Sequence, residues 1–227
     1  VEMGKFFADK GIKTAAIYGA FIPNPMHVYR TAGVLAGLGL SYGGATTEED
    51  VVGLIFADQG IDLSKISGDI KIVSYLQGYG DTTTDEINAA IQAAPEAFIS
   101  VGMATTFFTQ QLNAAGIEFS DIDSFTKSNG EAITNGKLVY LAGKYSSSVG
   151  PAFALVMNAI NGNVIRDAQG NAVSLSQNYQ VATDSETFDK FYKNDNGDNP
   201  IYSRDTLDQI IGDTVTFDTI NEVVASN

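Results

Sequence analysis

The sequence predicts an α/β protein in which a parallel sheet carries helices on both faces. Short apolar segments alternate with amphipathic segments along residues 2–160, the pattern of strands and helices that succeed one another in a parallel sheet. The chain has 227 residues, of which 44% are hydrophobic and 10% aromatic, so it can bury enough surface to form such a layered core. Because glycine and proline are not periodic, a collagen-like chain is excluded.

Five segments are expected to form the strands of this sheet. Most are short runs of apolar residues bounded by glycine or polar residues, as expected of strands that are buried on both faces. The expected strands are residues 14–21, 70–76, 97–102, 121–125 and 138–142.

Six amphipathic segments are expected to form helices. Asn24 is placed to cap the second helix, with Pro25 in its first turn. Acidic residues after Thr47 indicate the start of the third helix, and Gly116 ends the fifth. The expected helices are residues 2–10, 25–35, 48–58, 82–94, 105–115 and 148–160.

The pattern changes after Gly162. Residues 164–174, with Asp167-Ala-Gln-Gly170-Asn171 in their middle, predict a β-hairpin, and residues 175–183 predict an extended segment. A helical tail is then expected, formed by residues 185–193, 203–211 and 216–225.

Charge and composition exclude several classes of function. The chain has 13 Lys and Arg against 27 Asp and Glu, a formal net charge of −14, which disfavours binding to nucleic acid or to a membrane surface. It has no cysteine and a single histidine, His27, so thiol catalysis and zinc sites built from these residues are excluded. No P-loop, G-x-S-x-G or dinucleotide-binding motif occurs, and the Asp/Asn cluster at residues 194–199 lacks the spacing of a calcium loop. No catalytic residue, metal or cofactor is therefore predicted.

Three stretches occur in an order that carries a family resemblance. The first is a strand, a loop and Arg30-Thr-Ala-Gly33. The second is Ala97-Phe-Ile-Ser-Val-Gly102, followed by a helix that ends in Gln111-Leu-Asn-Ala-Ala-Gly116. The third is Ile133-Thr-Asn-Gly-Lys-Leu138, a strand, and Val149-Gly150, which opens a helix that runs to Asn161-Gly162-Asn163. In this order the chain resembles the C-terminal lobe of type I periplasmic-binding-protein folds, the sugar-type solute-binding proteins of ABC transporters and their repressor relatives.

The resemblance implies a domain organisation. Residues 1–183 would form the second lobe, a three-layer αβα unit, and residues 184–227 a helical tail that in the family returns to the first lobe. The family's N-terminal lobe has no counterpart in this sequence, so the chain is expected to be truncated relative to the family. The segment between Leu40 and Asp69 is longer than in the family, which indicates an inserted helix at residues 48–58.

The resemblance also implies a ligand site formed by Arg30, Ser100, Asp123, Ser124 and Lys144. Arg30 falls on the R-x-x-G position, whose guanidinium hydrogen-bonds the ligand in the family. The family often carries a polar Asn-Asp pair at the end of the third strand, where this sequence has Val101-Gly102, so Ser100 and the backbone are left to face the ligand. Asp123 with Ser124 either lies one residue away from the family's Gly-Phe-Asp motif or has lost that role. Lys144 falls near a ligand-contacting glutamine. Since all follow predicted parallel strands or face them, we expect them at one edge of the sheet.

Each of these residues also has a plain structural interpretation. Arg30 would then lie on a helix surface, Ser100 would end a buried strand, and Lys144 would be a solvated strand-end residue. If Arg30 and Lys144 both face the ligand, the site is cationic and favours an anionic ligand over a neutral sugar. Phe21 and His27 border the same edge, where they would either stack on a ligand or pack in the core.

The function implied by the resemblance is solute binding without catalysis. The chain would be part of the extracytoplasmic solute-binding component of an ABC importer, periplasmic or anchored to the cell surface as a lipoprotein, with a small polar solute and the membrane permease subunits as partners. One alternative is the ligand-sensing domain of a repressor or receptor with the same fold. A second alternative is an enzyme on a flavodoxin-like sheet, because a fold does not fix a function.

Overall fold

The computed structural model describes residues 1–20, 24–78, 84–197 and 200–226. The chain forms two compact units. The first comprises Val1–Asp123, Lys127–Ala142 and Ala182–Ser185, and the second comprises Ser124–Thr126, Gly143–Val181 and Glu186–Asn227. The main boundary between the units thus falls after Ala142, whereas the sequence suggested a domain boundary at residue 183.

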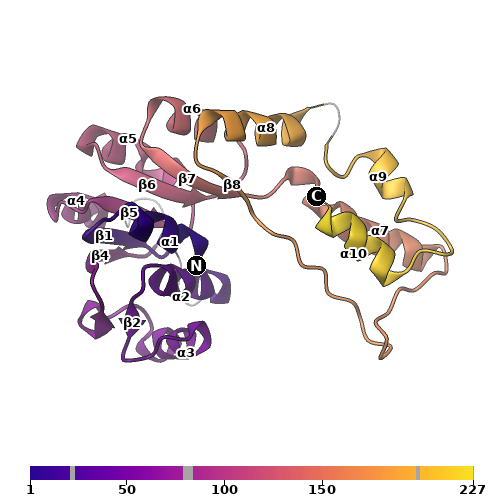
Figure 1. The fold of residues 1–227 in the computed structure, drawn as a ribbon, viewed down its shortest axis with the longest axis horizontal. Helices are drawn as coiled ribbons and strands as arrows, with labels where there is room; N and C mark the ends of the chain where they lie inside the picture. Colours follow the sequence, from indigo (N-terminus) through magenta and orange to yellow (C-terminus); the bar gives the residue numbers. More distant parts are fainter. Residues whose placement is uncertain (21–23, 79–83, 198–199, 227) are drawn as a thin grey trace. The chain divides into compact units, whose positions relative to one another are not determined.

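A six-stranded sheet in the order β4-β1-β5-β6-β7-β8 organises the fold (Figure 1). Pairing is parallel between β1 and β4, β1 and β5, β5 and β6, and β6 and β7, which confirms the predicted α/β class with a parallel sheet. The carboxyl ends of these strands therefore meet at one edge, as in other open α/β sheets. The strands are β1 (Thr14–Tyr18), β4 (Lys71–Leu76), β5 (Ala97–Ser100), β6 (Glu118–Ile122), β7 (Leu138–Gly143) and β8 (Gln180–Ala182).

The core of the first unit lies against the central strands of this sheet. Every residue of β5 is buried, as are four of the five residues of β1. Phe108 packs edge-on against two strand residues, with its ring centroid 4.9 Å from that of Tyr18 and 5.7 Å from that of Phe98. Burial of these rings accounts for the strands at 14–18 and 97–100, because large aromatic side chains dominate the free energy of burial.

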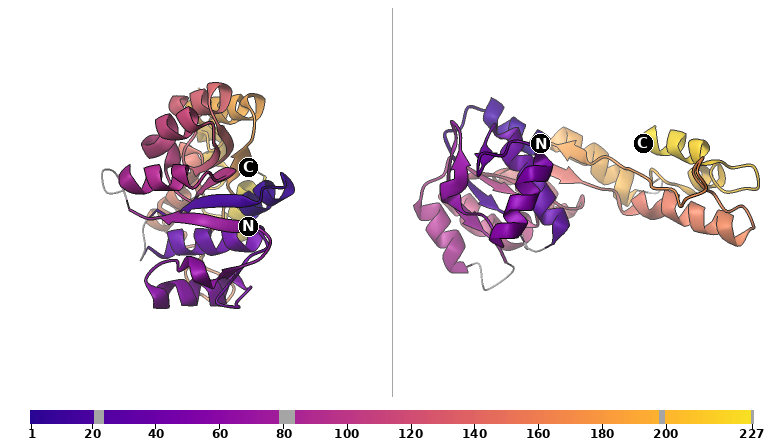
Figure 2. Two further views of the ribbon diagram at one scale, coloured as in Figure 1. Left: turned by 90° about the vertical axis from the view of Figure 1, so that its left-hand side faces the viewer. Right: turned by 90° about the horizontal axis from the view of Figure 1, so that it is seen from below.

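Helices cover both faces of the sheet. α1 (Glu2–Asp9) packs along α2 (Pro25–Gly37), while α4 (Thr84–Gln92), α5 (Ala104–Ala115) and α6 (Lys127–Asn135) pack in sequence (Figure 2). α1 and α2 lie unusually close, since a Cβ atom on Gly37 would fall 2.0 Å from the carbonyl oxygen of Val1. As predicted, Asn24 caps α2, where its side chain accepts a hydrogen bond from the backbone N–H of Met26 at 3.0 Å.

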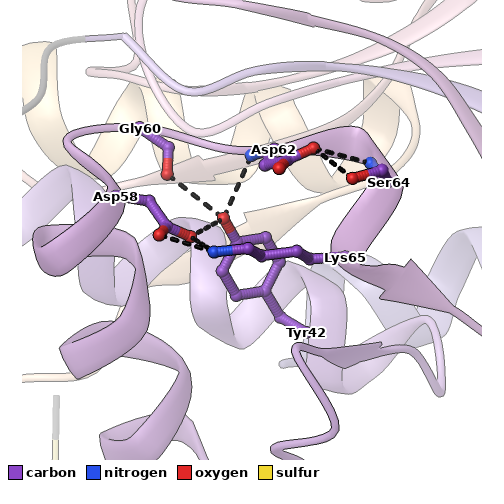
Figure 3. A network of polar contacts seen from close by, with 6 residues as sticks. All are labelled: Tyr42, Asp58, Gly60, Asp62, Ser64 and Lys65. Carbon is purple, nitrogen blue, oxygen red and sulfur yellow. Dashed lines mark hydrogen bonds and ion pairs between the residues drawn. The ribbon is translucent and has the colours of Figure 1, made fainter.

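The helix predicted at residues 48–58 is present as α3 (Glu48–Asp58) and is capped by Thr47. It is flanked by the two strands of a small antiparallel pair, β2 (Ser41–Tyr42) before it and β3 (Ile66–Ser67) after it. Tyr42 of β2 links the end of α3 to the segment that follows it through hydrogen bonds (Figure 3). The Tyr42 hydroxyl donates to Asp58 at 2.6 Å and accepts from the backbone N–H of Asp62 at 3.0 Å. Burial and the Asp58 carboxylate raise the pKa of Tyr42 to about 12, so its hydroxyl keeps its proton. Hydrogen bonds from Lys65 and then from Tyr42 lower the pKa of Asp58.

The second unit is built around α7 (Gly150–Ile160). Together with α9 (Arg204–Asp208) and α10 (Phe217–Ala225), α7 encloses a cluster centred on Ala154, Ile210 and Ile220 (Figure 1). The buried side chain of Asn158 fixes the chain after α9, donating to the Ile210 carbonyl and accepting from the Gly212 N–H, both at 2.8 Å. The tail predicted from residue 185 therefore consists of α8 (Ser185–Asn196) and of helices that pack on α7.

Two sequence expectations need correction, and two features were not expected. The strand expected at residues 121–125 lies at Glu118–Ile122, because the register of β5 aligns Ala97 with Glu118. The expected hairpin is reduced to a turn closed by an isolated bridge between Arg166 and Ala172, in which the Asp167 carboxylate accepts from the backbone. α6 and the β2–β3 pair were not predicted. Among the described residues, no helix has the length and apolar character needed to cross a membrane.

Candidate functional site

The carboxyl edge of the parallel sheet holds the first predicted ligand residue. Arg30 lies on α2 and is half-buried, and its guanidinium donates to the carbonyl of Val101 at 3.0 Å. Val101 is the first residue after β5, so this hydrogen bond brings the Arg30 side chain to the carboxyl edge. A guanidinium presents its donors in a rigid fork, which makes a side chain fixed in this way suited to recognise polar groups.

Ser100, the last residue of β5, is buried and bonded to its own chain. Its hydroxyl donates to the Gly102 carbonyl at 2.8 Å and accepts from the Gly102 N–H at 3.1 Å. A Cβ on Gly102 would lie 2.9 Å from that of Ala20, so glycine allows the loops after β1 and β5 to pack closely. Ser100 therefore shapes the β5–α5 loop in this structure.

A buried carboxylate that the sequence did not predict as functional lies beside that loop. Asp121, in β6, is fully buried and accepts hydrogen bonds from the backbone N–H groups of Ala104 and Thr105, each at 2.9 Å. These are the first residues of α5, which has no other side-chain cap, so Asp121 fixes the start of that helix. Burial raises the pKa of Asp121 to about 7. An acidic residue between buried strand positions was the available signal, but the strand was placed three residues too late.

Asp123 and Ser124 follow β6 directly. The backbone N–H of Asp123 donates to Ala142 at 3.1 Å, which extends the β6–β7 pairing to the edge. Asp123 is half-buried and Ser124 is exposed. Within the first unit, the structure thus brings Arg30, Ser100 and Asp123 to one edge of the sheet, as the topology predicted.

Lys144 follows β7 and belongs to the second unit, as does Ser124. It is exposed, and its ammonium lies 5.2 Å from the ring centroid of Tyr179. Both residues line a cavity of about 760 Å³. The remaining lining residues are Tyr145, Ser148, Ser174, Ser176, Gln177, Asn178, Gln180, Ile201, Tyr202, Phe217, Asn221, Val224 and Ala225. Most of these residues lie in irregular segments, whereas Phe217, Asn221, Val224 and Ala225 lie on α10, so no single sequence pattern indicated the cavity.

The remaining candidates from the sequence are His27, Phe21 and the Asp/Asn cluster at residues 194–199. His27 is buried in α2, and Phe21 lies outside the described residues. In the Asp/Asn cluster, the Asp195 carboxylate accepts from the backbone and hydroxyl of Ser146, and Asn196 donates to the Phe125 carbonyl at 3.2 Å. Among residues with described positions, no group of three or more His, Asp or Glu side chains is arranged to hold a metal ion.

Comparison with known proteins gives a match at the level of fold. No family model matches the sequence, and no curated protein matches it. The fold is similar to that of the periplasmic binding protein component of the arabinose ABC transporter from Shewanella sp. ANA-3, solved with bound α- and β-L-arabinofuranose. The TM-score is 0.51 at 16% identity, over 84% of this chain and 57% of that chain. An ABC transporter periplasmic solute-binding protein from Actinobacillus succinogenes 130Z, solved with D-allose, gives a TM-score of 0.47 at 16% identity, over 84% of this chain and 59% of that one.

The similarity to the Shewanella structure establishes the α/β fold of a periplasmic-binding-protein lobe. The chain spans little more than half the length of the solved proteins it resembles. The proteins it resembles are named as binding components of transporters rather than as enzymes.

Proposed function

We propose that this chain is part of the solute-binding component of an ABC importer and that it contacts a small polar solute at the carboxyl edge of its parallel sheet. The observation that carries the proposal is the position of Arg30, whose guanidinium is held at the end of β5 by its hydrogen bond to Val101. Ligands of open α/β sheets bind at this edge, and a planar fork of N–H donors suits hydroxyl or carboxylate oxygens.

The fold supports the class of function. The Shewanella protein is the binding component of an arabinose transporter and shares the architecture of the sheet. In the proposed mechanism a second lobe supplies the remaining contacts, and the solute stabilises the closed arrangement because only that arrangement lets both lobes touch it. In this proposal the closed form docks on the permease, and the protein acts outside the cytoplasm, in the periplasm or at the cell surface as a lipoprotein.

Within the proposed site, Asp123 is assigned as the acceptor for solute hydroxyl groups. It is half-buried at the end of β6, next to the exposed Ser124. Ser100 contributes indirectly, since its hydroxyl holds the β5–α5 loop whose carbonyl at Val101 fixes Arg30. The solute class best supported by this set of donors and acceptors is a neutral monosaccharide.

The proposal is tested by titrating the protein with L-arabinose and D-allose and following binding by saturation-transfer NMR. Replacement Arg30→Gln is expected to weaken binding about tenfold or more, the effect of losing a charge-assisted hydrogen bond. Arg204→Gln is the matched control, because the Arg204 side chain is 92% exposed and pairs with Asp208 of its own helix at 3.8 Å. Unaltered sugar binding by a folded Arg30→Gln variant would contradict the proposed site.

A further inference from the structure

The cavity beside Lys144 lies entirely within the second compact unit. All of its lining residues belong to Gly143–Val181 or to the segment from Glu186 onward. Its volume of about 760 Å³ is in the range of cavities that hold small organic ligands. Arg30 and Asp123, which carry the function proposed above, belong to the other unit, so the two sites can be examined separately.

The charge of the lining differs from that of the chain as a whole. The protein has 27 acidic residues and a net charge of −14, yet none of the Asp and Glu residues that the structure describes lines the cavity. Lys144 is the single charged residue among those lining it. The lining thus offers one positive charge in an otherwise neutral, polar setting, which favours a ligand with one negative charge over a cation.

The Lys144 ammonium contacts an aromatic ring of the cavity lining. Its ammonium lies 5.2 Å from the ring centroid of Tyr179, within cation–π distance, and none of the ion pairs formed between described residues involves it. Tyr179 is itself 39% exposed. A ligand carboxylate bound here would neutralise the ammonium, and the exposed part of the ring offers an apolar surface to the carbon skeleton of the ligand.

Polar side chains line the same cavity, and hydrogen bonds fix the orientation of one of them. The Gln177 amide donates to the carbonyl of Ser148 at 3.0 Å and to the Tyr202 hydroxyl at 3.3 Å, which fixes the orientation of that amide. Tyr202 is buried, and burial raises its pKa, so the hydroxyl stays neutral and retains a proton to donate. Asn178 and Asn221 add amide groups, each both donor and acceptor. Such groups match the hydroxyls of a carbohydrate.

We propose that this cavity binds a monosaccharide that carries a carboxylate, with Lys144 pairing with the carboxylate and Tyr179 packing on the sugar ring. An inorganic anion would use Lys144 alone and leave the apolar lining of Ile201, Phe217 and Val224 without contact. A neutral sugar would leave the ammonium of Lys144 without a counter-charge. A sugar acid satisfies both parts of the cavity.

The test compares D-galacturonate with D-galactose, which differ only in a carboxylate against a hydroxymethyl group. Binding is followed by ligand-observed NMR on the whole chain, up to about 10 mM sugar, a range that detects dissociation constants near 1 mM. The unmodified protein is expected to bind galacturonate at least about tenfold more tightly than galactose, the scale of one charge-assisted hydrogen bond. Lys144→Gln should abolish this preference, and Tyr179→Ala should weaken galacturonate binding.

Lys190→Gln is the control, because Lys190 is exposed on α8 outside the cavity and its replacement changes the net charge equally. Galacturonate binding that is as tight in Lys144→Gln as in Lys190→Gln overturns the inference. So does the absence of galacturonate binding, because the cavity is complete within one unit. If Arg30→Gln weakens binding of arabinose while galacturonate shows no dependence on Lys144, the proposed function stands and only this inference is lost.

Discussion

At the scale of single residues, Asp121 shows how a buried group can shape a candidate site without touching a solute. Its carboxylate accepts from the first two backbone N–H groups of α5 and from the N–H of Ile122, each at 2.9 Å. The loop between β5 and α5 carries Val101, which fixes Arg30. The position of the Arg30 guanidinium thus depends on a residue of β6, far from Arg30 in the sequence.

Asp121 also predicts a pH dependence of stability. Burial raises its pKa in the folded protein from 3.8 to about 7, so between these values the folded state binds a proton that the unfolded state has lost. The contribution of Asp121 is therefore fully present below about pH 4 and is lost as the pH rises toward 7, with a slope of at most about 1.4 kcal/mol per pH unit. Asp121→Asn should remove this part of the dependence.

The measurement is urea unfolding of both proteins at several pH values between about 4 and 8. Asp208→Asn serves as the control, since it removes the same charge from a side chain that is 67% exposed. A free-energy difference between the unmodified protein and Asp121→Asn that does not vary with pH would contradict the assignment.

At the scale of elements, α7 has two apolar faces with different surroundings. Ala154 and Asn158 face the cluster shared with α9 and α10, whereas Phe153 and Val156 are 49% and 56% exposed. A helix that is apolar all round usually has partners on both sides. Because its side chains are exposed, the outer face of α7 contributes little to the stability of this chain, although it is as apolar as the inner face.

Two substitutions separate these faces. Val156→Lys on the outer face is expected to change the free energy of unfolding by no more than about 0.5 kcal/mol. Ile210→Ala, which removes a fully buried side chain from the inner cluster, is expected to lower it by about 2–5 kcal/mol. Denaturant titration measures both. A loss in Val156→Lys as large as that in Ile210→Ala would show that the outer face is covered in solution.

The elements also show what the sequence could predict. The buried runs of β1, β5 and β7 and the capped helices α2 and α3 follow from local patterns, and all were predicted. α6 was missed because its sequence, KSNGEAITN, is mostly polar and buries only Asn129 and Ala132. β6 was predicted three residues too late, because its buried Ser120 and Asp121 are polar and resemble loop residues. In the folded protein, hydrogen bonds to other elements satisfy both side chains.

The two candidate sites differ in how far the sequence indicated them. The position of Arg30 at the carboxyl edge was predictable, because the family resemblance places its R-x-x-G pattern after a buried strand, whereas its role in ligand binding stays a prediction. The cavity beside Lys144 was not predictable, since Tyr179, Gln177 and Tyr202 lie in segments without periodicity, and only tertiary folding brings them together.

At the scale of the whole molecule, each compact unit has its own apolar core. The first is built on β1, β5 and α5 around Phe98 and Phe108, and the second on α7, α9 and α10 around Ile210 and Ile220. Regions that are stabilised by separate sets of buried contacts open with separate free energies, and amide hydrogen exchange reports those openings. The division into units therefore has a measurable consequence.

Ile210→Ala is expected to accelerate exchange in α7 and α10 while the amides of β1 and β5 keep their rates. Phe108→Leu should do the reverse, because Phe108 is buried against Tyr18 and Phe98 in the first unit. Hydrogen exchange followed by mass spectrometry, with peptides that resolve these elements, measures both variants against the unmodified chain. If either substitution accelerated exchange equally in all four elements, the chain would open as one cooperative structure, and sugar binding in one unit would then stabilise the other to the same extent.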